Sequence, residues 1–283
     1  MKSLTGKTAL ISGASRGIGL AIARRFAAEG ASVVLCASRL GAHGKLQGTL
    51  QEAAALIQAQ HGKAAAIACD LRDTEARADL LAQAAQFFGP IDILVNNAAA
   101  ADMTLPSAVT TAQRNFMYDL NVNVPIELAQ QAMPSMRERG AGWILNISSH
   151  SCEQPIVPYR DSAIAAHVIT AYGATKAALN RYSSGLAHEV AEHGICVNTL
   201  APENIVLTSG AEYVRDIARR NPDMAEPVEM MAEAALALCS GGILGQICYS
   251  RQLVHSMGIS VKSLDGQTIL GSALLPADLD ASV

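Results

Sequence analysis

Aromatic residues are scarce in this chain, and charge of one sign is not in excess. Phe, Trp and Tyr make up 4% of the 283 residues, and the formal net charge is −4 at pH 7. Few rings and a mildly acidic balance argue against a base-stacking surface, a basic face for nucleic acid, and attraction to an anionic membrane. We therefore expect neither a nucleic-acid partner nor a membrane partner.

Long hydrophobic runs and paired cysteines are also missing. No uninterrupted apolar stretch reaches the roughly 18 residues of a membrane-spanning helix, and the opening "MKSLTGKTALIS" contains no apolar export segment. The six cysteines are scattered without a CxxC pair, and several stand in apolar runs such as "VVLCA", where a reduced thiol packs as a small hydrophobic group. This usage predicts a reducing compartment and a cytoplasmic protein.

Half of the residues are hydrophobic, enough for a sizeable core in one large domain. Short apolar runs alternate with amphipathic stretches; the runs are "TALIS", "SVVLCA", "AAAIACD", "IDILVNN", "GWILNIS", "ICVNTLAP" and "GQICYS". Each run is continuously apolar, which is typical of strands buried on both faces of a parallel sheet. We predict an α/β fold, a Rossmann-like doubly wound seven-stranded parallel sheet flanked by helices, forming a single domain over residues 1–283.

A glycine-rich turn follows the first predicted strand in "ISGASRGIGLAIA" and opens a helix. Gly13, Gly17 and Gly19 let the backbone turn tightly and approach a pyrophosphate, whose negative charge the helix N-terminus favours. A glycine cluster alone is weak evidence, but its place between a strand and a helix predicts a dinucleotide site.

A phenol and an ammonium stand four residues apart in "AYGATKAAL", at Tyr172 and Lys176. Residues i and i+4 share one face of a helix, so both side chains can enter the same cleft. A free tyrosine has a pKa of about 10, and a nearby positive charge should lower that pKa toward the range of a general base. The alternative is a packed tyrosine beside a surface lysine.

Three motifs in one order, namely the glycine turn, "NNAA" at 96–99 and Tyr172-x-x-x-Lys176, resemble the short-chain dehydrogenase/reductase family over about residues 5–250. The resemblance implies a nicotinamide cofactor and a catalytic set of Ser149, Tyr172, Lys176 and Asn121. Ser149 would hydrogen-bond the substrate oxygen, and Asn121 would hold a water that links the lysine to solvent. Asn123 is a rival for Asn121.

The serine is the main departure from the family pattern. Ser149 precedes Tyr172 by 23 residues, a longer gap than the family usually leaves. Ser148 and Ser151 are its neighbours, and Ser162 is a fallback outside the strand context. Tyr159 cannot replace Tyr172, because Ala163 follows it where the lysine would stand; we expect Tyr159 to line the substrate pocket.

The resemblance also implies a set of cofactor contacts, namely Gly13, Ser15, Arg16, Gly17, Ile18, Gly19, Ser38, Arg39, Asp70, Leu71, Asn97, Ala98, Tyr172, Lys176, Pro202, Ile205 and Thr208. An acidic residue after the second strand would bind the ribose hydroxyls of NAD, but Ala37 and Ser38 stand there. Arg16 and Arg39 suit a 2′-phosphate, so we expect NADP(H), with NAD(H) possible. The alternative is that each arginine is a solvated surface charge. His43 and Lys45 could add contacts.

Three further positions bear on this site. Asn96 closes the fourth predicted strand, where it either supports the cofactor region or serves as a structural amide. Ala99 replaces the glycine that ends the usual "NNAG". Glu203 replaces the glycine of a Pro-Gly segment that leads to Ile205 and Thr208, and glutamate lacks the backbone freedom of glycine.

Substrate loops are expected near 150–170 and 203–227. The first contains Ile156, Val157, Pro158, Tyr159, Ile164 and Val168, and this apolar character suggests a hydrophobic alcohol or ketone. Residues 45–73 resemble hydroxysteroid-dehydrogenase-like members of the family. His150 and His167 lack a ligand partner at metal-binding spacing, so we expect no metal site.

The sequence therefore predicts an oxidoreductase that transfers a hydride between NADP(H) and a hydrophobic secondary alcohol or ketone by a Ser-Tyr-Lys(-Asn) mechanism. Two alternatives remain open: reduction of an activated double bond, and a non-catalytic nucleotide-sensing protein on the same fold. The resemblance further implies a homodimer or homotetramer.

Overall fold

The computed structural model describes residues 2–42, 48–153, 169–208, 218, 220 and 222–271. A seven-stranded sheet in the order β3-β2-β1-β4-β5-β6-β9 forms its centre, and every pairing is parallel. The strands are β1 (Thr8–Ser12), β2 (Ser32–Ala37), β3 (Lys63–Ala68), β4 (Ile93–Asn96), β5 (Gly142–Ile147), β6 (Ile195–Ala201) and β9 (Ile247–Tyr249). The predicted Rossmann-like sheet is confirmed.

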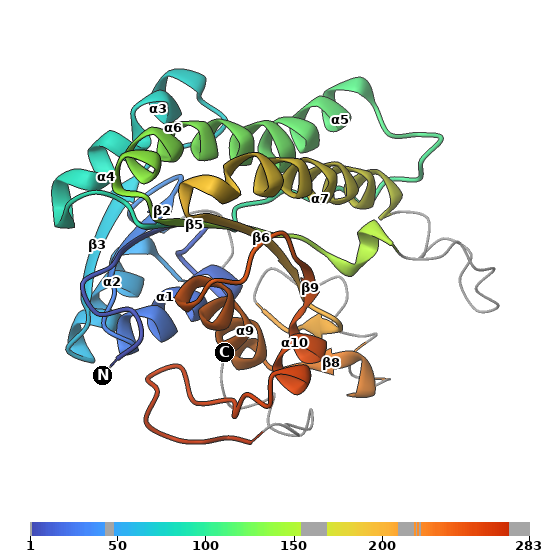
Figure 1. Ribbon diagram of the computed structural model, residues 1–283. Coiled ribbons are helices and arrows are strands. Elements are labelled where there is room, and N and C mark those ends of the chain that lie inside the picture. The colour runs from blue at the N-terminus through green and yellow to red at the C-terminus, as the bar shows by residue number, and fades with distance from the viewer. Residues whose placement is uncertain are drawn as a thin grey trace.

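Helices cover both faces of this sheet (Figure 1). One face carries α1 (Gly17–Ala28), α2 (Leu50–Ala59), α9 (Val228–Ser240) and α10 (Ser250–Ser256). The other face carries α3 (Thr74–Ala78), α4 (Leu80–Phe88), α5 (Thr111–Tyr118), α6 (Val124–Arg139) and α7 (Thr170–Val190). A π-helical turn (Asp119–Asn123) joins α5 to α6, and three short 3₁₀ turns lie at His150–Cys152, Ala191–His193 and Pro222–Met224.

The apolar runs form strands because their residues are buried alternately on the two faces. In β1, Leu10 packs in the core beneath α4, α6 and α7, whereas its neighbour Ile11 packs in the core beneath α1, α2 and α9. Val34 and Leu35 of β2 divide in the same way. A strand with both faces covered has no place for alternating polar residues, which explains the continuous apolar pattern.

The chain reverses its direction of sheet growth between β1 and β4, which lie side by side. In doubly wound sheets, ligands bind in the crevice at the carboxyl ends of the strands where this reversal occurs. The glycine turn after β1 and the "NNAA" segment after β4 meet there.

A second, two-stranded parallel sheet was not anticipated from the sequence. Its strands, β7 (Ile205–Val206) and β8 (Ala225–Glu226), pair Val206 with Glu226. Both strands lie within the expected substrate loop at 203–227, of which the structure describes residues 203–208, 218, 220 and 222–227.

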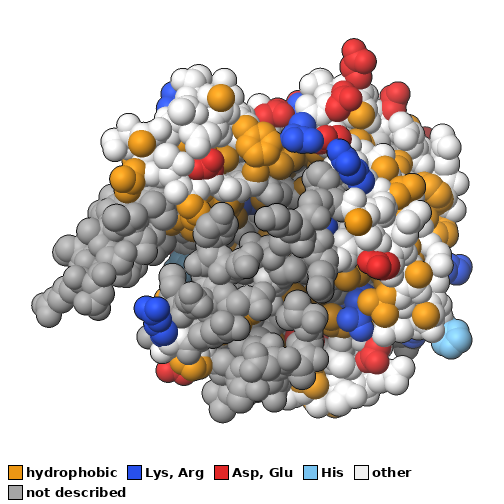
Figure 2. Space-filling view, turned by 180° about the vertical axis from the view of Figure 1, so that it is seen from behind, with side chains coloured by type: hydrophobic (Ala, Val, Ile, Leu, Met, Phe, Trp, Pro, Cys, Tyr) orange, Lys and Arg blue, Asp and Glu red, His pale blue; other side chains and the backbone are white. Residues whose placement is uncertain are grey.

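On the face seen in Figure 2, acidic and basic side chains of the described residues are interspersed rather than gathered by sign. Within the part of the chain that the structure describes, no helix has the length and apolar character required to cross a membrane.

Candidate active site

The glycine turn closes tightly against the end of β4. Gly13 and Gly17 have φ of 63° and 57°, in the left-handed region that favours glycine. A Cβ on Gly19 would lie 2.5 Å from the side-chain nitrogen of Asn97 and 2.6 Å from the Gly13 carbonyl oxygen. Glycine is therefore required at position 19, because a side chain would force the turn away from β4.

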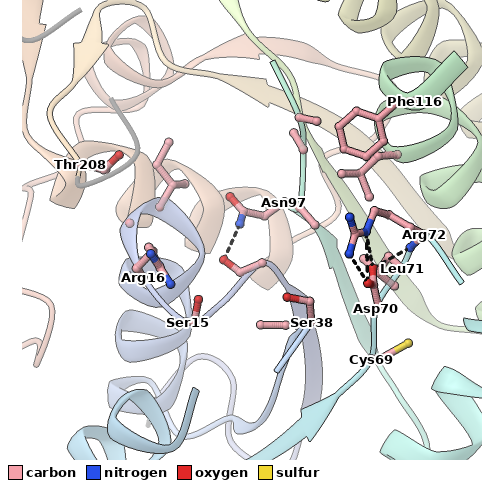
Figure 3. Close-up of a pocket in the computed structure, with 18 residues that line it drawn as sticks. Ser15, Arg16, Ser38, Cys69, Asp70, Leu71, Arg72, Asn97, Phe116 and Thr208 are labelled. Atoms are coloured by element: carbon pink, nitrogen blue, oxygen red, sulfur yellow. Dashed lines mark hydrogen bonds and ion pairs between the residues drawn. The ribbon is translucent and has the colours of Figure 1, made fainter. Parts of the chain in front are cut away.

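Two residues, Asn97 and Ser12, fix this turn, and Ser12 was not among the predicted site residues. The Asn97 side-chain amide donates to the carbonyl oxygen of Ser12 at 3.0 Å. It also donates to the carbonyl oxygen of Gly13 at 3.1 Å, as Figure 3 shows. The Ser12 hydroxyl in turn accepts from the backbone amides of Asn97 and Ala98, both at 3.0 Å. Ser12 thus fixes the distance between the ends of β1 and β4.

Asn96 lies at the sheet centre, away from this turn. Its amide donates to the Asn146 side-chain oxygen at 2.8 Å, and Asn146 donates to the Ser183 hydroxyl at 2.8 Å. These contacts match the structural alternative for Asn96.

A cavity of about 540 Å³ opens beside the glycine turn (Figure 3). Eleven of the predicted cofactor contacts line it: Gly13, Ser15, Arg16, Gly17, Ile18, Ser38, Asp70, Leu71, Asn97, Ala98 and Thr208. Seven other residues line it as well: Ala37, Cys69, Arg72, Ala99, Ala100, Phe116 and Leu120. Its volume falls in the range of small-molecule sites.

An arginine and a carboxylate pair at one end of this cavity, and the charge of a second arginine acts on that carboxylate. Arg72 forms an ion pair of 2.5 Å with Asp70, and hydrogen bonds from Arg72, assisted by the charge of Arg39, lower the pKa of Asp70 to about 2. Arg39 is exposed and does not line the cavity, yet it lies close enough to act on Asp70. Arg72 was missed by the sequence reading, although it stands two residues after Asp70.

Arg16 occupies the N-cap position of α1, without a side-chain capping bond, and lines the cavity. One terminal nitrogen, Nη2, donates to the carbonyl oxygen of Gly48 at 3.1 Å. The other, Nη1, is buried and has no hydrogen-bond partner among the described residues. A guanidinium donor is therefore left over at this site.

Ser149, Tyr172 and Lys176 come together at the carboxyl end of β5. The Ser149 side chain lies close enough to Tyr172 to act on the pKa of its phenol, so the 23-residue gap does not separate them. The Lys176 ammonium donates to the Ile147 carbonyl oxygen at 2.7 Å and lies 5.7 Å from the centroid of the Tyr172 ring. The Ser151 hydroxyl donates to the Ser149 hydroxyl at 2.9 Å, and this contact helps to orient the Ser149 side chain.

The expected direction of the tyrosine pKa shift was wrong for this structure. Burial raises the pKa of Tyr172 to about 12, and the hydrogen bond with Ser149 opposes that rise. Burial also lowers the pKa of Lys176 to about 8, since its side chain is only 2% exposed. Desolvation outweighs the attraction between the two groups because the ammonium is bound to a backbone carbonyl and not to the phenol oxygen.

Asn121 lies on the π-helical turn and is fully buried. Its side chain donates to the Ala100 carbonyl and accepts from the Ala100 amide, both at 2.8 Å, and donates to the Thr175 hydroxyl at 2.9 Å. Thr175 donates to the Tyr172 carbonyl at 2.7 Å, which connects the turn to the tyrosine helix. Asn123, the rival, is exposed. Thr175 carried no signal in the sequence.

Arg77 of α3 holds the π-helical turn in place. Its guanidinium, on a residue only 3% exposed, donates to both carboxylate oxygens of Asp119 and of Glu127 at 2.6–3.2 Å. It also donates to the Leu71 carbonyl at 2.7 Å, and Leu71 lines the cavity.

The segment after β6 reaches the cavity only at its far end. Pro202 directly follows the strand and Ile205 opens β7, and neither lines the cavity. Thr208 does, and its side chain would lie 3.4 Å from a Cβ on Gly17.

Several predicted residues fall outside the described residues: His43, Lys45, Ile156, Val157, Pro158, Tyr159, Ser162, Ile164, His167 and Val168. Within the described ranges, no three His, Cys, Asp or Glu side chains gather in a way that could hold a metal ion. His150 places its Nδ1 3.0 Å from the Glu203 carbonyl oxygen.

Comparison with known proteins identifies relatives of this arrangement. The family model for short chain dehydrogenases matches residues 7–217. Ketoacyl reductase HetN of Nostoc sp. is 34% identical over 202 residues, which are 71% of this chain and 64% of that protein. Hydroxysteroid dehydrogenase-like protein 2 of Danio rerio is 33% identical over 278 residues, 96% of this chain and 63% of that protein. The chain spans less than two thirds of the length of either relative.

Solved structures agree with this family. A short chain dehydrogenase of Mycobacterium thermoresistibile has a TM-score of 0.76 at 32% identity, over 96% of this chain and 95% of that one. A 7α-hydroxysteroid dehydrogenase, solved with NADH and 7-oxo glycochenodeoxycholic acid, has a TM-score of 0.76 at 31% identity, over 87% and 93%. A metagenomic short-chain oxidoreductase, solved with NADP, has a TM-score of 0.70 at 26% identity, over 87% and 97%. The chain belongs to the short-chain dehydrogenase/reductase family of oxidoreductases.

Proposed function

We propose that this chain is an NADP(H)-dependent oxidoreductase that interconverts a hydrophobic secondary alcohol and its ketone. The observation that carries the proposal is the cluster of Ser149, Tyr172 and Lys176, joined through Thr175 to Asn121. The Asn121 side chain in turn binds the backbone of Ala100, which lines the cavity. The proximity of Ser149 to Tyr172 favours carbonyl chemistry over reduction of an activated double bond, since that alternative relied on a displaced serine.

The residues present fit a nicotinamide dinucleotide. Gly13 and Gly17 leave the backbone bare where a pyrophosphate would approach, and the Nη1 donor of Arg16 lacks a partner among the described residues. When bound, the nicotinamide supplies or accepts the hydride. Gly13, Ser15 and Gly17 would hold the pyrophosphate, and Asp70 and Leu71 would bind the adenine end.

Tyr172 is the proposed general acid and base. With a pKa of about 12 its hydroxyl keeps the proton at neutral pH, so it can donate that proton to a carbonyl oxygen. Ser149 would hold the same substrate oxygen through its hydroxyl. Lys176, with a pKa of about 8, carries a charge at neutral pH that would favour the phenolate after the proton has left.

Asn121 is proposed as the link between this cluster and the solvent. Its side-chain oxygen and nitrogen are already bound to Ala100 and Thr175, so a proton relay would pass through water at its backbone carbonyl. π-Helical turns of this kind occur frequently at functional sites.

The preference for NADP(H) is supported by charge. Ser38 stands where a carboxylate would select NAD. Arg16 and Arg72 line the cavity, and Arg39 lies close enough for its charge to act on Asp70 in the cavity wall. Guanidinium groups suit a 2′-phosphate better than they suit a neutral hydroxyl.

The names of the relatives, a ketoacyl reductase and hydroxysteroid dehydrogenase-like proteins, support the substrate class. Both names point to substrates that carry a hydroxyl or carbonyl group on a hydrophobic carbon skeleton. We further propose a cytoplasmic homodimer or homotetramer, and light scattering after size-exclusion chromatography would measure its mass.

Cofactor titration tests the proposal. NADPH and NADH would be titrated separately into the wild type and Arg39→Ala, following nicotinamide fluorescence. We expect NADPH binding to weaken about 10-fold or more in the variant, because a charged hydrogen bond contributes about 1.5–3 kcal/mol, while NADH binding stays unchanged. Arg137→Ala, which removes an exposed ion pair with Glu189, is the control.

Equal affinity for both cofactors in the wild type and in Arg39→Ala would contradict the preference for NADP(H). Binding of neither cofactor would return the protein to the non-catalytic alternative. A panel of hydrophobic ketones with NADPH would then test the substrate class, with Tyr172→Phe as the inactive reference.

A further inference from the structure

Glu226, at the end of β8, is a fully buried carboxyl. Within the described residues it forms no ion pair: the nearby Arg251 donates instead to the Ala225 carbonyl at 3.1 Å. Buried carboxylates without a cation are rare because burial strongly disfavours their charge. A contribution to stability therefore does not explain why a carboxyl stands at this buried position.

Both oxygens of this carboxyl lead to one short stretch of backbone. Oε1 accepts from the Ser250 hydroxyl at 2.5 Å, and that hydroxyl accepts from the Glu203 amide at 3.3 Å. Oε2 accepts from the Asn204 amide at 3.3 Å. Two successive amides directly after Pro202 are thus bound by Glu226, one of them through Ser250.

The same stretch is held at further points. β7 pairs in register with β8, so that Val206 lies opposite Glu226. The side-chain oxygen Oε2 of Glu203 accepts from the Gln252 amide in the first turn of α10 at 3.1 Å. The Glu203 carbonyl lies 3.0 Å from Nδ1 of His150, which directly follows Ser149. Glutamate at position 203, in place of a flexible glycine, is therefore an anchor.

The segment runs from the end of β6 to Thr208 on the cavity wall. We propose that Glu226 is a positioning residue that orders residues 202–206, so that this backbone is preformed to receive the nicotinamide end of the cofactor. The inference rests on the proposed function, because it requires that a nicotinamide dinucleotide occupy the cavity. It adds a carboxyl, remote from the reacting atoms, on which cofactor affinity depends.

The ionised carboxyl is the form that this role requires. A carboxylate accepts only, so it can take the Ser250 hydroxyl and the Asn204 amide at once, whereas a protonated acid must place a donor on one oxygen. Burial raises the pKa of Glu226 to about 7, the Glu203 charge acts in the same direction, and the Ser250 and Asn204 hydrogen bonds and the Arg251 charge oppose it. Among the described residues, the charged groups facing Glu226 are therefore Arg251 and Glu203, with His150 one contact further away.

The sign of the effect on stability follows from this direction. Between the ordinary pKa of 4.5 and the folded value of about 7, the folded chain binds more protons than the unfolded chain. The free energy of unfolding therefore falls as pH rises through this window. Ionised Glu226 should therefore lower the free energy of unfolding while it orders residues 202–206. A residue with a purely structural role would raise the free energy of unfolding instead.

Glu226→Gln tests the proposal, with the exposed Glu192→Gln as its control. Urea unfolding of the protein alone and NADPH titration would be measured at pH 5.5, 6.5, 7.5 and 8.5. At pH 8.5 we expect Glu226→Gln to have a higher free energy of unfolding than the wild type. Its free energy of unfolding should not show the decline between pH 5.5 and 7.5 that we expect for the wild type. Its NADPH affinity at pH 8.5 should fall about threefold to tenfold, as for one lost hydrogen bond. Wild-type affinity should decrease toward pH 5.5, and affinity in Glu226→Gln should vary less.

Ser250→Ala provides a second, independent variant. It cuts only the relay between Glu226 and the Glu203 amide, so it should also weaken NADPH binding, and it decides the question if Glu226→Gln does not fold. Wild-type NADPH affinity at pH 8.5 in a folded Glu226→Gln, or in Ser250→Ala if the first does not fold, would overturn the inference and leave the proposed function intact. Failure of the wild type to bind any nicotinamide cofactor would overturn both.

Discussion

Gly173, directly after Tyr172, should be the most sensitive glycine of α7. A Cβ at this position would overlap the Ser151 carbonyl oxygen and come within 3.1 Å of its carbonyl carbon. Ser151 belongs to the 3₁₀ turn that follows Ser149, and its hydroxyl donates to Ser149. Gly173→Ala would therefore push this turn away from α7 and pull Ser149 out of reach of Tyr172.

The magnitude follows from two opposing effects. Replacing glycine by alanine inside a helix stabilises it by about 0.8–1 kcal/mol. Overpacking against backbone costs about 1–3 kcal/mol, because the neighbour cannot move aside as a flexible side chain could. We expect Gly173→Ala to lower the free energy of unfolding by about 1 kcal/mol. Turnover should fall by about 10-fold to 100-fold, since misplacement by about 1 Å can cost that much.

Gly185 on the same helix is the matched control. A Cβ there would meet only the tip of Arg181, at 3.7 Å, and the residue is exposed. Gly185→Ala should raise the free energy of unfolding by about 0.5–1 kcal/mol and leave turnover unchanged. Urea unfolding and steady-state rates with NADPH and a hydrophobic ketone would measure both variants.

The reasoning would be refuted if Gly173→Ala behaved like Gly185→Ala, gaining stability at unchanged turnover. That result would mean that the turn from Ser149 to Cys152 does not pack on α7, and that the Ser149–Tyr172 contact does not depend on it. A loss of stability with full turnover would refute only the catalytic half of the argument.

Two further predictions concern buried charges. Between pH 8 and 10, the free energy of unfolding of the wild type should rise by about 2 kcal/mol relative to that of Lys176→Met. Burial lowers the pKa of this lysine from 10.5 to about 8, so in this pH range the unfolded chain binds more protons than the folded chain. The same pH dependence in both proteins, measured by urea unfolding, would contradict this prediction. Arg77→Leu should cost about 3 kcal/mol by leaving Asp119 and Glu127 without their buried partner. Arg137→Leu, which breaks an exposed pair, should cost less than about 1 kcal/mol; equal costs in denaturant melts would show that the Arg77 contacts contribute nothing beyond a surface ion pair.

The sheet could be predicted from the sequence because burial on both faces leaves a simple trace. Runs such as those around Leu10 and Val34 are apolar throughout, and the seven of them form the seven strands. β7 and β8 could not be found in this way. Each has two residues, and one of the four is Glu226, a charged type that no apolar pattern would include.

The site was predictable where residue type and local spacing carry the chemistry, as in the glycine turn and in Tyr172 with Lys176. Contacts made by tertiary packing were not predictable: Ser12, Thr175 and Phe116 have no local signal. The predicted direction of the Tyr172 pKa shift was wrong for the same reason. Spacing places a lysine near a tyrosine, whereas the extent of burial and the carbonyl that binds the ammonium come only from the fold.

The guanidinium of Arg77 has a consequence for changing cofactor preference. It binds the Leu71 carbonyl on one half of the doubly wound fold and Asp119, at the start of the turn that carries Asn121, on the other. Substitutions between Asp70 and Arg72 would be transmitted through this one side chain to the proton-handling turn. Ser38 and Arg39, directly after β2, make no hydrogen bond to Arg77 among the described contacts, although the charge of Arg39 acts on Asp70. Redesign toward NADH should therefore begin at β2, where affinity can be altered without a loss of rate.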